Sequence, residues 1–571
     1  MKNVFSILLL AFVGTVSAQT GPDVIVDAKG NREIEPAFRV TEAPKIIDTV
    51  KATKVASYPF LVYQAPTKIF LDTIEAASVE TKEKLQQLYP FYVKVGMGSV
   101  LMPLGELYFN STRSRAYNYG LHVKHLSSFG DVKDRNKITY APAQFDNTDL
   151  SLFGKINQSN YNLAGAFNYK NNGFHYYGIP VDSIPKDSIA QRYQQFGGNI
   201  DFTGNRGDTT TLNYKLGAAY NFFDTKKPQP DSLAIWRVRE HNFKFNSRLW
   251  YLNKSETFYG DLGVRYNGYR YGIADSVRTP SDSGLVANNT IIDFRPGVLS
   301  RFLDNKLKVD VGLQLSVDIH QKTKVYVYPM IDFQLSLFND IFIPYLGVRG
   351  GLTQNTYRSL STINPFLVSM MYLQNEHNPY EAFGGFKGTL TKRLSFNIGA
   401  SFGRYLNKAF FINDSLQMNK FTLVYDTVNI TRIEGSMSYQ MNEKLKIDGI
   451  GRFYSYQTKN QAFAWNMPQL QFVLRGSYNL YDKFLLKIDG LLESGRKALV
   501  YAPGTGVLQE NGQYYKNLGF IADFNLGFEY RYNPRVSAFI QFNNLAAQRY
   551  NRWYNYPVLP FQVLGGITAR F

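Results

Sequence analysis

The residue types that carry most enzymatic and metal chemistry are scarce in this chain. Its 571 residues contain no cysteine and only six histidines, at positions 122, 125, 175, 241, 320 and 377. Without cysteine there can be no thiolate nucleophile, thiolate metal site or disulfide. No HExxH zinc motif occurs, and no serine is predicted at the strand-to-helix turn of a nucleophile elbow. We therefore expect no catalytic, metal or cofactor site.

The remaining candidates for chemistry have simpler interpretations. His122 and His125 are three apart, which puts them on opposite faces of a strand, so they cannot share a metal there. His320 shares a face with Asp318 near a strand end, which is typical of an ordinary polar pair. Arg206-Gly207-Asp208 spells an adhesion tripeptide, but Gly-Asp is also common turn chemistry, and a turn is the interpretation we favour.

The elements that must position these residues are long alternating strands. In residues 306–320, Leu307, Val309 and the odd positions up to Ile319 form an apolar face, and the even positions form a polar one. An unbroken period of two over this length indicates a strand rather than a helix. The strand is also long enough to cross a membrane when tilted. The same alternation recurs along the chain, which predicts an all-β transmembrane antiparallel β-barrel.

The connections set the number of strands. Ten tight polar turns, among them residues 205–208 and 339–340, alternate with eleven other connections that are mostly longer. The longer ones include residues 355–378, 407–428 and 546–560. Short turns on one side and long loops on the other are typical of outer-membrane barrels. The count predicts about twenty-two strands, with short periplasmic turns and longer extracellular loops.

Both ends of the chain indicate an outer-membrane protein. Met1 to Ala18 has a basic start, an apolar centre and small residues before Gln19, which is the layout of a secretory signal peptide. The apolar stretch is too short to span a membrane as a helix. At the other end, alternate positions of the last eleven residues form an apolar face that ends at a terminal aromatic. We expect this face to be the signal for outer-membrane assembly, carried by Phe561, Val563, Ile567 and Phe571, with Gly565 and Ala569 between them.

The composition fits a barrel with an apolar outside and a polar inside. Aromatic residues make up 15%, with 41 Tyr, 43 Phe and only 4 Trp, beside 45 Gly and a mean hydropathy of −0.26. The net charge of +18 is spread along strands and turns rather than gathered in one patch. We therefore expect no nucleic-acid partner. Two roles for the positive charge stay open: an electropositive lumen, or contact with anionic outer-membrane lipid.

The C-terminal region also carries a family resemblance. Residues 524–545, which end in Asn544-Leu545, the segment 549–557 with Tyr556-Pro557, and the final strand resemble the end of TonB-dependent receptor barrels. The chain looks like a member of the Bacteroidota branch of TonB-dependent-receptor-like proteins. This resemblance covers roughly residues 85–571. It implies a twenty-two-strand barrel, matching the independent count, and a role in uptake across the bacterial outer membrane.

The resemblance fails at the beginning of the chain. Receptors of this family carry an N-terminal plug domain, whereas here only residues 19–88 lie between the signal peptide and the barrel expected at 89–571. This stretch has five prolines and weak strand signals, so we expect an extended periplasmic or lumen-inserted segment. Asp23 to Asp27 faintly resembles the short strand by which receptors engage TonB. A barrel of this size needs its lumen closed, and the sequence leaves open what closes it.

Two long connections are candidates for function. Residues 355–378, with Asn364-Pro365-Phe366-Leu367, could form a short helix folded into the lumen or over its mouth, or a plain surface loop. The aromatic group Tyr550, Trp553, Tyr554 and Tyr556 could stack on sugars, although a membrane-interface girdle is favoured.

These features lead to an outer-membrane transporter or channel, porin-like or receptor-like, whose substrate the sequence does not identify. The alternative is a non-transporting structural or accessory subunit of a multi-protein outer-membrane complex. The expected partners are outer-membrane lipid, the barrel assembly machinery, other outer-membrane proteins and a TonB-type energy transducer.

Overall fold

The computed structural model describes residues 88–204, 212–226, 236–273, 285–442 and 444–571. The signal peptide expected at 1–18, the segment 19–87 with its Asp23–Asp27 stretch, and the Arg206–Asp208 turn lie outside the described residues. Every structural statement below concerns the described part of the chain.

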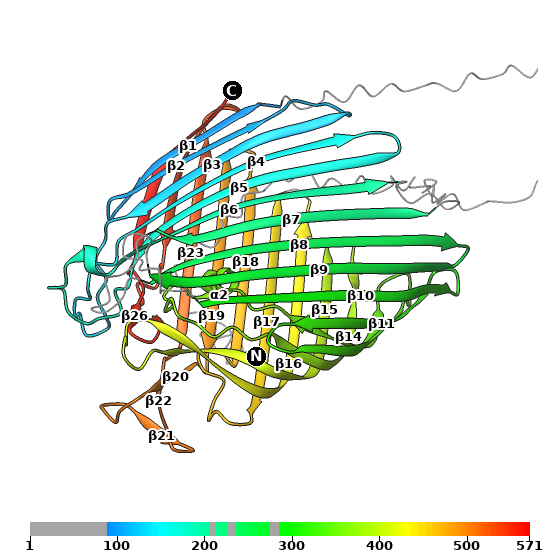
Figure 1. Cartoon of the computed structure of the whole chain (residues 1–571). Coiled ribbons are helices and arrows are strands. Elements are labelled where there is room, and N and C mark those ends of the chain that lie inside the picture. The colour runs from blue at the N-terminus through cyan, green and yellow to red at the C-terminus, as the bar shows by residue number, and fades with distance from the viewer. Residues whose placement is uncertain (1–87, 205–211, 227–235, 274–284, 443) are drawn as a thin grey trace, which may run out of the picture. The chain divides into compact units, whose positions relative to one another are not determined.

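The fold is a closed, antiparallel, twenty-two-strand β-barrel. Neighbouring barrel strands are hydrogen-bonded in sequence order, and β27 returns to pair with β1, which closes the ring (Figure 1). This confirms the fold class and the strand count that the sequence predicts. The barrel strands are β1 (Phe91–Gly98), β2 (Met102–Asn110), β3 (Tyr117–Ser128), β4 (Phe145–Asn157), β5 (Tyr161–His175), β6 (Ala190–Gly204), β7 (Asn213–Thr225), β8 (Trp236–Asn253), β9 (Glu256–Ile273), β10 (Leu285–Phe302), β11 (Leu307–Ile319), β12 (Thr323–Leu335), β13 (Ile343–Thr353), β14 (Glu376–Thr391), β15 (Leu394–Asn413), β16 (Phe421–Met441), β17 (Leu445–Thr458), β18 (Leu470–Leu480), β19 (Phe484–Ser494), β23 (Ile521–Arg531), β24 (Val536–Asn543) and β27 (Gln562–Arg570).

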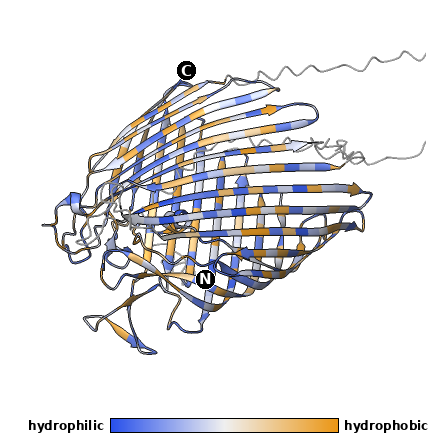
Figure 2. Cartoon of the chain, viewed as in Figure 1, coloured by the Kyte–Doolittle hydropathy of each residue, from blue (hydrophilic) through white to orange (hydrophobic). Residues whose placement is uncertain are grey.

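Apolar and polar residues alternate along the strands, as the banding in Figure 2 shows. On β11 the apolar positions are exposed to the outside, with Leu313 at 52% and Val311 at 49%. Their neighbours Gln314 and Ser316 point inward and are buried. A closed ring leaves no unpaired strand edge, which is what a spanning sheet in lipid requires. Together with its apolar outer band, this architecture places the protein in a bacterial outer membrane.

The two rims of the barrel differ. Tight connections, such as residues 254–255 between β8 and β9, lie at the rim where β1 begins and β27 ends. Exposed aromatic side chains mark this rim, among them Phe338, Tyr481 and Tyr532. Phe571 stacks on Phe91 there, with ring centroids 5.5 Å apart. This rim is therefore the periplasmic one, and the long loops are extracellular.

The connection expected at residues 407–428 is mostly strand, so this prediction is wrong. β15 continues through Asn413 and β16 begins at Phe421, which leaves a loop of residues 414–420. Asn407 has a positive φ of 56°, and the pairing of β15 with β16 shifts register between Tyr405 and Lys408. The polar break in the sequence is therefore a β-bulge, after which the ladder resumes.

A few smaller elements lie in the extracellular loops. They are the 3₁₀ turn η1 (Lys186–Ser188), the helix α2 (Tyr357–Ile363), a small sheet of β20 (Lys497–Val500), β21 (Leu508–Glu510) and β22 (Gln513–Asn517), and the pair β25 (Asn551–Trp553) and β26 (Tyr556–Pro557). No helix among the described residues is long and apolar enough to span a membrane.

The largest cluster of buried apolar side chains lies at the extracellular end of the barrel. It unites side chains from β6, β7 and β9 with side chains from β15, β16 and two loops, residues 354–375 and 544–561. Strands far apart around the ring share one core only if something crosses the lumen between them. That crossing element is the candidate functional site.

Candidate functional site at the mouth of the barrel

The loop of residues 354–375 connects β13 to β14 and contains α2. The helix starts where its sequence provides a cap. The Thr356 side chain accepts a hydrogen bond from the Ser359 amide at 3.0 Å, and the Ser359 hydroxyl accepts one from the Thr356 amide at 3.0 Å. This reciprocal capping satisfies two amides that a helix start leaves unpaired. Figure 1 shows α2 within the ring of strands. Of the two interpretations of this segment, an inward-folded helix is the one the structure adopts.

A carboxylate on the barrel wall anchors the first turn of α2. Glu240 on β8 faces the lumen and is fully buried. Its two oxygens accept hydrogen bonds from the amides of Tyr357 and Arg358 at 2.7 and 2.8 Å. Amides at a helix start carry partial positive charge, so a carboxylate there is stabilising.

Three tyrosine hydroxyls hold the segment that follows the helix. Tyr193 of β6 donates to the carbonyl of Pro365 at 2.8 Å, and Tyr176 donates to the carbonyl of Leu367 at 2.9 Å. Tyr269 of β9 donates to the carbonyl of Ser369. Burial raises the pKa of Tyr176 to about 12, so its hydroxyl stays protonated and available as a donor at neutral pH.

The same segment also contacts the other side of the ring. Leu367 forms a parallel bridge with Phe421 at the start of β16. The Phe421 amide donates to the carbonyl of Phe366 at 2.7 Å, and the Val368 amide donates to the carbonyl of Phe421 at 2.9 Å. Loop 354–375 is therefore fastened to β6, β8 and β9 on one side and to β16 on the other, so it crosses the lumen.

An aromatic cluster joins this loop to two others. The ring of Phe366 stacks on Tyr556 with centroids 3.8 Å apart, and Tyr177 meets Tyr556 edge-on at 4.8 Å. The Tyr177 hydroxyl donates to the carbonyl of Pro557 at 3.0 Å. The rings of Phe421 and Trp553 complete the contact at 5.6 Å. Side chains from three loops thus meet in one cluster at the extracellular end of the barrel.

The aromatic group at 550–556 is not a membrane-interface girdle, as we favoured, nor an exposed sugar platform. Tyr550 and Tyr556 are fully buried, and Trp553 is nearly so. Tyr554 is half-buried. Tyr550, Tyr556 and Trp553 point into the protein because the loop of residues 544–561 turns inward. Composition alone does not encode that direction.

Polar contacts fix the base of the loop. The side-chain amides of Asn375 and Asn289 of β10 exchange hydrogen bonds at 2.6 and 3.0 Å. Asn375 also donates to Asp318 at 2.8 Å, and Gln354 donates to the carbonyl of Asn289 at 3.0 Å. Instead, Nδ1 of His320 donates to the backbone carbonyl of Asn288 at 3.3 Å. Asp318 therefore serves the loop, and no hydrogen bond joins it to His320.

The other histidines have structural partners. His122 and His125 point to opposite faces, as the sequence predicts: His122 lies 3.0 Å from Glu106 on the inner face, and His125 lies 2.8 Å from Thr148 on the outer face. His241 contacts the hydroxyl of Tyr220 at 2.7 Å. The described residues contain no group of three or more histidines and carboxylates placed to hold a metal ion.

The C-terminal strand has the orientation expected of an assembly signal. The lipid side of β27 carries Val563, Gly565 and Ile567. Phe561 and Phe571 flank the strand and are exposed. Whether these residues direct assembly stays a prediction.

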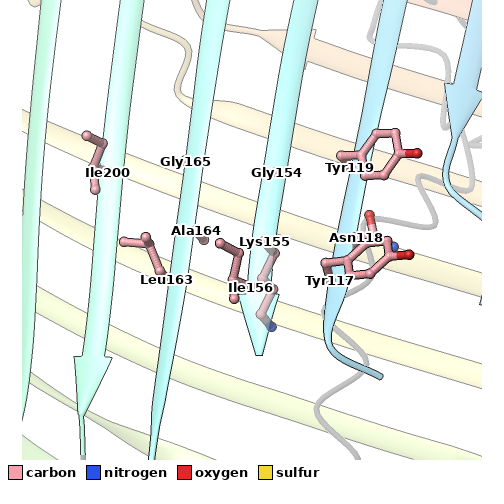
Figure 3. Close-up of a pocket in the computed structure, with 10 residues that line it drawn as sticks. All are labelled: Tyr117, Asn118, Tyr119, Gly154, Lys155, Ile156, Leu163, Ala164, Gly165 and Ile200. Atoms are coloured by element: carbon pink, nitrogen blue, oxygen red, sulfur yellow. The ribbon is translucent and has the colours of Figure 1, made fainter. Parts of the chain in front are cut away.

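A hollow lies on the lipid side of the wall, away from the mouth. It is a shallow, almost wholly apolar groove of about 380 Å³ across β3 to β6 (Figure 3). Gly154 and Gly165 are paired directly across β4 and β5 and form its floor, and Tyr119 and Ile200 stand at its sides. Because this face contacts hydrocarbon, the groove is not part of a path for polar solutes.

Fold and site define a class of protein: a large outer-membrane β-barrel whose lumen is crossed at its extracellular end by one of its own loops. No protein-family model and no curated protein sequence matches the chain. Solved structures do match, and those described below are TonB-dependent outer-membrane receptors.

The FrpB iron transporter from Neisseria meningitidis aligns with a TM-score of 0.65 and 11% identity, over 85% of this chain and 82% of its own. The pyoverdine outer-membrane receptor FpvA from Pseudomonas aeruginosa aligns with a TM-score of 0.61 and 11% identity, over 86% and 79%. The ferric-catecholate import receptor Fiu from E. coli K12 aligns with a TM-score of 0.59 and 12% identity, over 85% and 82%. The TM-scores show that the barrel fold is shared. At identities this low, the matches show the fold alone.

Proposed function

We propose that the protein is an outer-membrane transporter of the TonB-dependent-receptor-like kind, in which loop 354–375 is the gate of the lumen. The observation that carries this proposal is the loop itself, which is fastened from the β6–β9 wall across to β16. A barrel that only displayed a surface would not need a polar inner wall around a wide lumen together with a structured closure at its mouth.

The fastenings are suited to a reversible closure. Most are single hydrogen bonds from side chains to backbone, such as Tyr193 to the carbonyl of Pro365, and each contributes about 1 kcal/mol net. Such contacts can be exchanged for contacts with a solute at modest cost. Gating loops are expected to be drawn from the less stable parts of a structure.

Further parts of the proposal rest on the comparisons and on the sequence. The similarity to TonB-dependent receptors supports an energy transducer as a partner, and the faint Asp23–Asp27 resemblance would be its contact. The Bacteroidota assignment rests on the C-terminal resemblance.

Cells expressing a loop-deleted variant test the gate. Residues 356–372 would be replaced by a short Gly-Ser linker, which keeps Asn375 and the strands. We expect these cells to become sensitive to a large hydrophilic antibiotic that intact outer membranes exclude, whereas cells with the full-length protein at the same surface level do not. Equal resistance in both, with the variant folded in the membrane, would reject loop 354–375 as the closure.

An accessory subunit of a larger outer-membrane complex is the second candidate function. Purification from detergent-solubilised membranes under native conditions separates the two. Recovery of the barrel alone, or with an energy transducer, supports transport. Stoichiometric recovery with several other outer-membrane proteins would favour the accessory role.

A further inference from the structure

Two neighbouring strands place like charges face to face inside the lumen. Lys244 of β8 and Arg265 of β9 are directly paired in the sheet and both point inward. Like charges directly opposite each other on adjacent strands are destabilising. A negative group beside either cation relieves part of this repulsion, so the partners of each cation decide what the pair can bind.

Arg265 has its own negative partner. Its guanidinium donates to Asp293 of β10 at 2.6 Å and to the carbonyl of Leu352 at 3.1 Å. Asp293 is itself fully engaged, because it also accepts hydrogen bonds from Gln314 and Ser316. This carboxylate is therefore committed to Arg265 and the wall, and Lys244 remains opposite a cation.

A third cation, Arg358, belongs to the helix α2 of loop 354–375. The amide of Arg358 in α2 is bound to Glu240, which lies on the same strand and the same face as Lys244, four residues nearer the extracellular rim. This contact places α2, which carries Arg358, against the same face of β8 as Lys244. The Nε atom of Arg358 is buried and has no hydrogen-bond partner within the described residues.

The surrounding carboxylates are occupied elsewhere. Both oxygens of Glu240 accept helix amides, and Asp261 pairs with Arg248 at 2.9 Å. Asp318 accepts from Asn375. Within the described residues, neither Lys244 nor Arg358 has a carboxylate within ion-pair distance.

We propose that Lys244, Arg358 and Arg265 form an anion-binding site on the lumen side of loop 354–375, which takes a carboxylate or phosphate group of the transported solute. The site deepens the proposed transport function and rests on it for its physiological meaning. Because Arg358 belongs to the gate and the other two cations to the wall, a bound anion joins gate and wall. A solute could thereby bias the gate by its differential contacts with the closed and open states.

Thermal unfolding of the purified full-length barrel in detergent tests the site, with inorganic phosphate and citrate as probes. The variants are Lys244→Gln and Arg358→Gln, and the matched control is Arg475→Gln, a lumen-facing arginine of β18 that lies 3.9 Å from Asp489. We expect citrate or phosphate to raise the unfolding temperature of the parent and the control, compared with chloride at equal ionic strength. Either site variant should bind about tenfold more weakly.

The unfolding temperature without added probe anions is a second measurement, in which Lys244→Gln should not lose stability. Without the probe anions, Lys244→Gln removes a like-charge repulsion, so it should be at least as stable as the parent. Equal stabilisation of all four proteins would assign the effect to the overall charge of +18 and overturn the site. No stabilisation of the parent by either anion would overturn it as well. Both results leave the antibiotic-sensitivity test of the gate untouched, so failure of the anion site is distinguishable from failure of the transport proposal.

Discussion

Four side chains of or near the barrel wall fasten loop 354–375. Glu240 holds two amides of the first helical turn, and Tyr176, Tyr193 and Tyr269 each hold one carbonyl of the segment that follows. These wall groups are far from the loop in sequence, so their role emerges only from the closed ring.

The substitution Glu240→Gln should loosen the loop without unfolding the barrel. A glutamine offers one acceptor oxygen in place of two and carries no charge, so one helix amide loses its partner. The loss should be roughly 1–3 kcal/mol of loop docking. Hydrogen exchange of residues 354–375 would then be roughly tenfold to hundredfold faster.

Glu434→Gln is the matched control, since Glu434 faces the lumen and pairs with Arg452 at 2.7 Å but does not contact the loop. If both variants accelerate exchange in the loop equally, Glu240 has no special part in holding it.

Closure should be insensitive to pH near neutrality and fail under alkaline conditions. Burial raises the pKa of Tyr176 to about 12, from about 10 when the loop is released. A raised pKa favours the neutral hydroxyl in the closed state, so the stabilisation is fully present below pH ~10 and is lost as the pH rises towards ~12. Hydrogen exchange of the loop, followed against pH and corrected for intrinsic rates, measures this. Opening between pH 6 and 8 with no further change above ~10 would contradict it.

At the scale of elements, the sequence predicts the barrel better than the loops. The alternation of residues 306–320 defines β11 because each position faces either lipid or lumen, which is a local consequence of the pleat. Asn407 misleads because a bulge and a turn both use a polar residue with positive φ. The predicted strand count is still correct despite this error, because β15 and β16 are both counted whatever the length of the loop between them.

The candidate site could be predicted only in part. Thr356 and Ser359 signal a helix start, and Asn364 to Leu367 suggest a compact loop, but their direction depends on Glu240, more than a hundred residues away. The inward burial of Tyr550 and Tyr556 has the same origin. The cations Lys244 and Arg265 do lie on the polar face of alternating strands, so a register of β8 against β9 would have brought them together.

The seam between β27 and β1 makes a prediction at this scale. Gly566 and Gly96 are paired there, and a Cβ on Gly566 would lie 2.0 Å from the carbonyl oxygen of Val95. Backbone cannot yield as a flexible side chain does, so Gly566→Ala should force the strands apart and cost at least 1–3 kcal/mol.

Gly435→Ala on β16 is the control, because a Cβ there meets nothing within 4 Å. The folded fraction, read from the electrophoretic mobility of unheated samples, and the unfolding temperature would compare the two. Equal folding of both variants would show that the seam is looser than this geometry implies.

At the scale of the whole molecule, a wide barrel is compatible with an intact outer membrane only if its lumen is closed. Here three extracellular loops meet in one aromatic cluster, and loop 354–375 is fastened to the wall at its base, helix and tip. The shared fold with TonB-dependent receptors describes the wall. The loop is what makes this barrel a candidate gated transporter.

Single-channel conductance in planar bilayers tests this claim most directly, by comparing the purified full-length barrel with the variant lacking residues 356–372. We predict that the full-length protein is silent or nearly so and that the variant shows a large, stable conductance. A folded variant as silent as its parent, or a parent that already conducts as well as the variant, would contradict the assignment of the gate to loop 354–375.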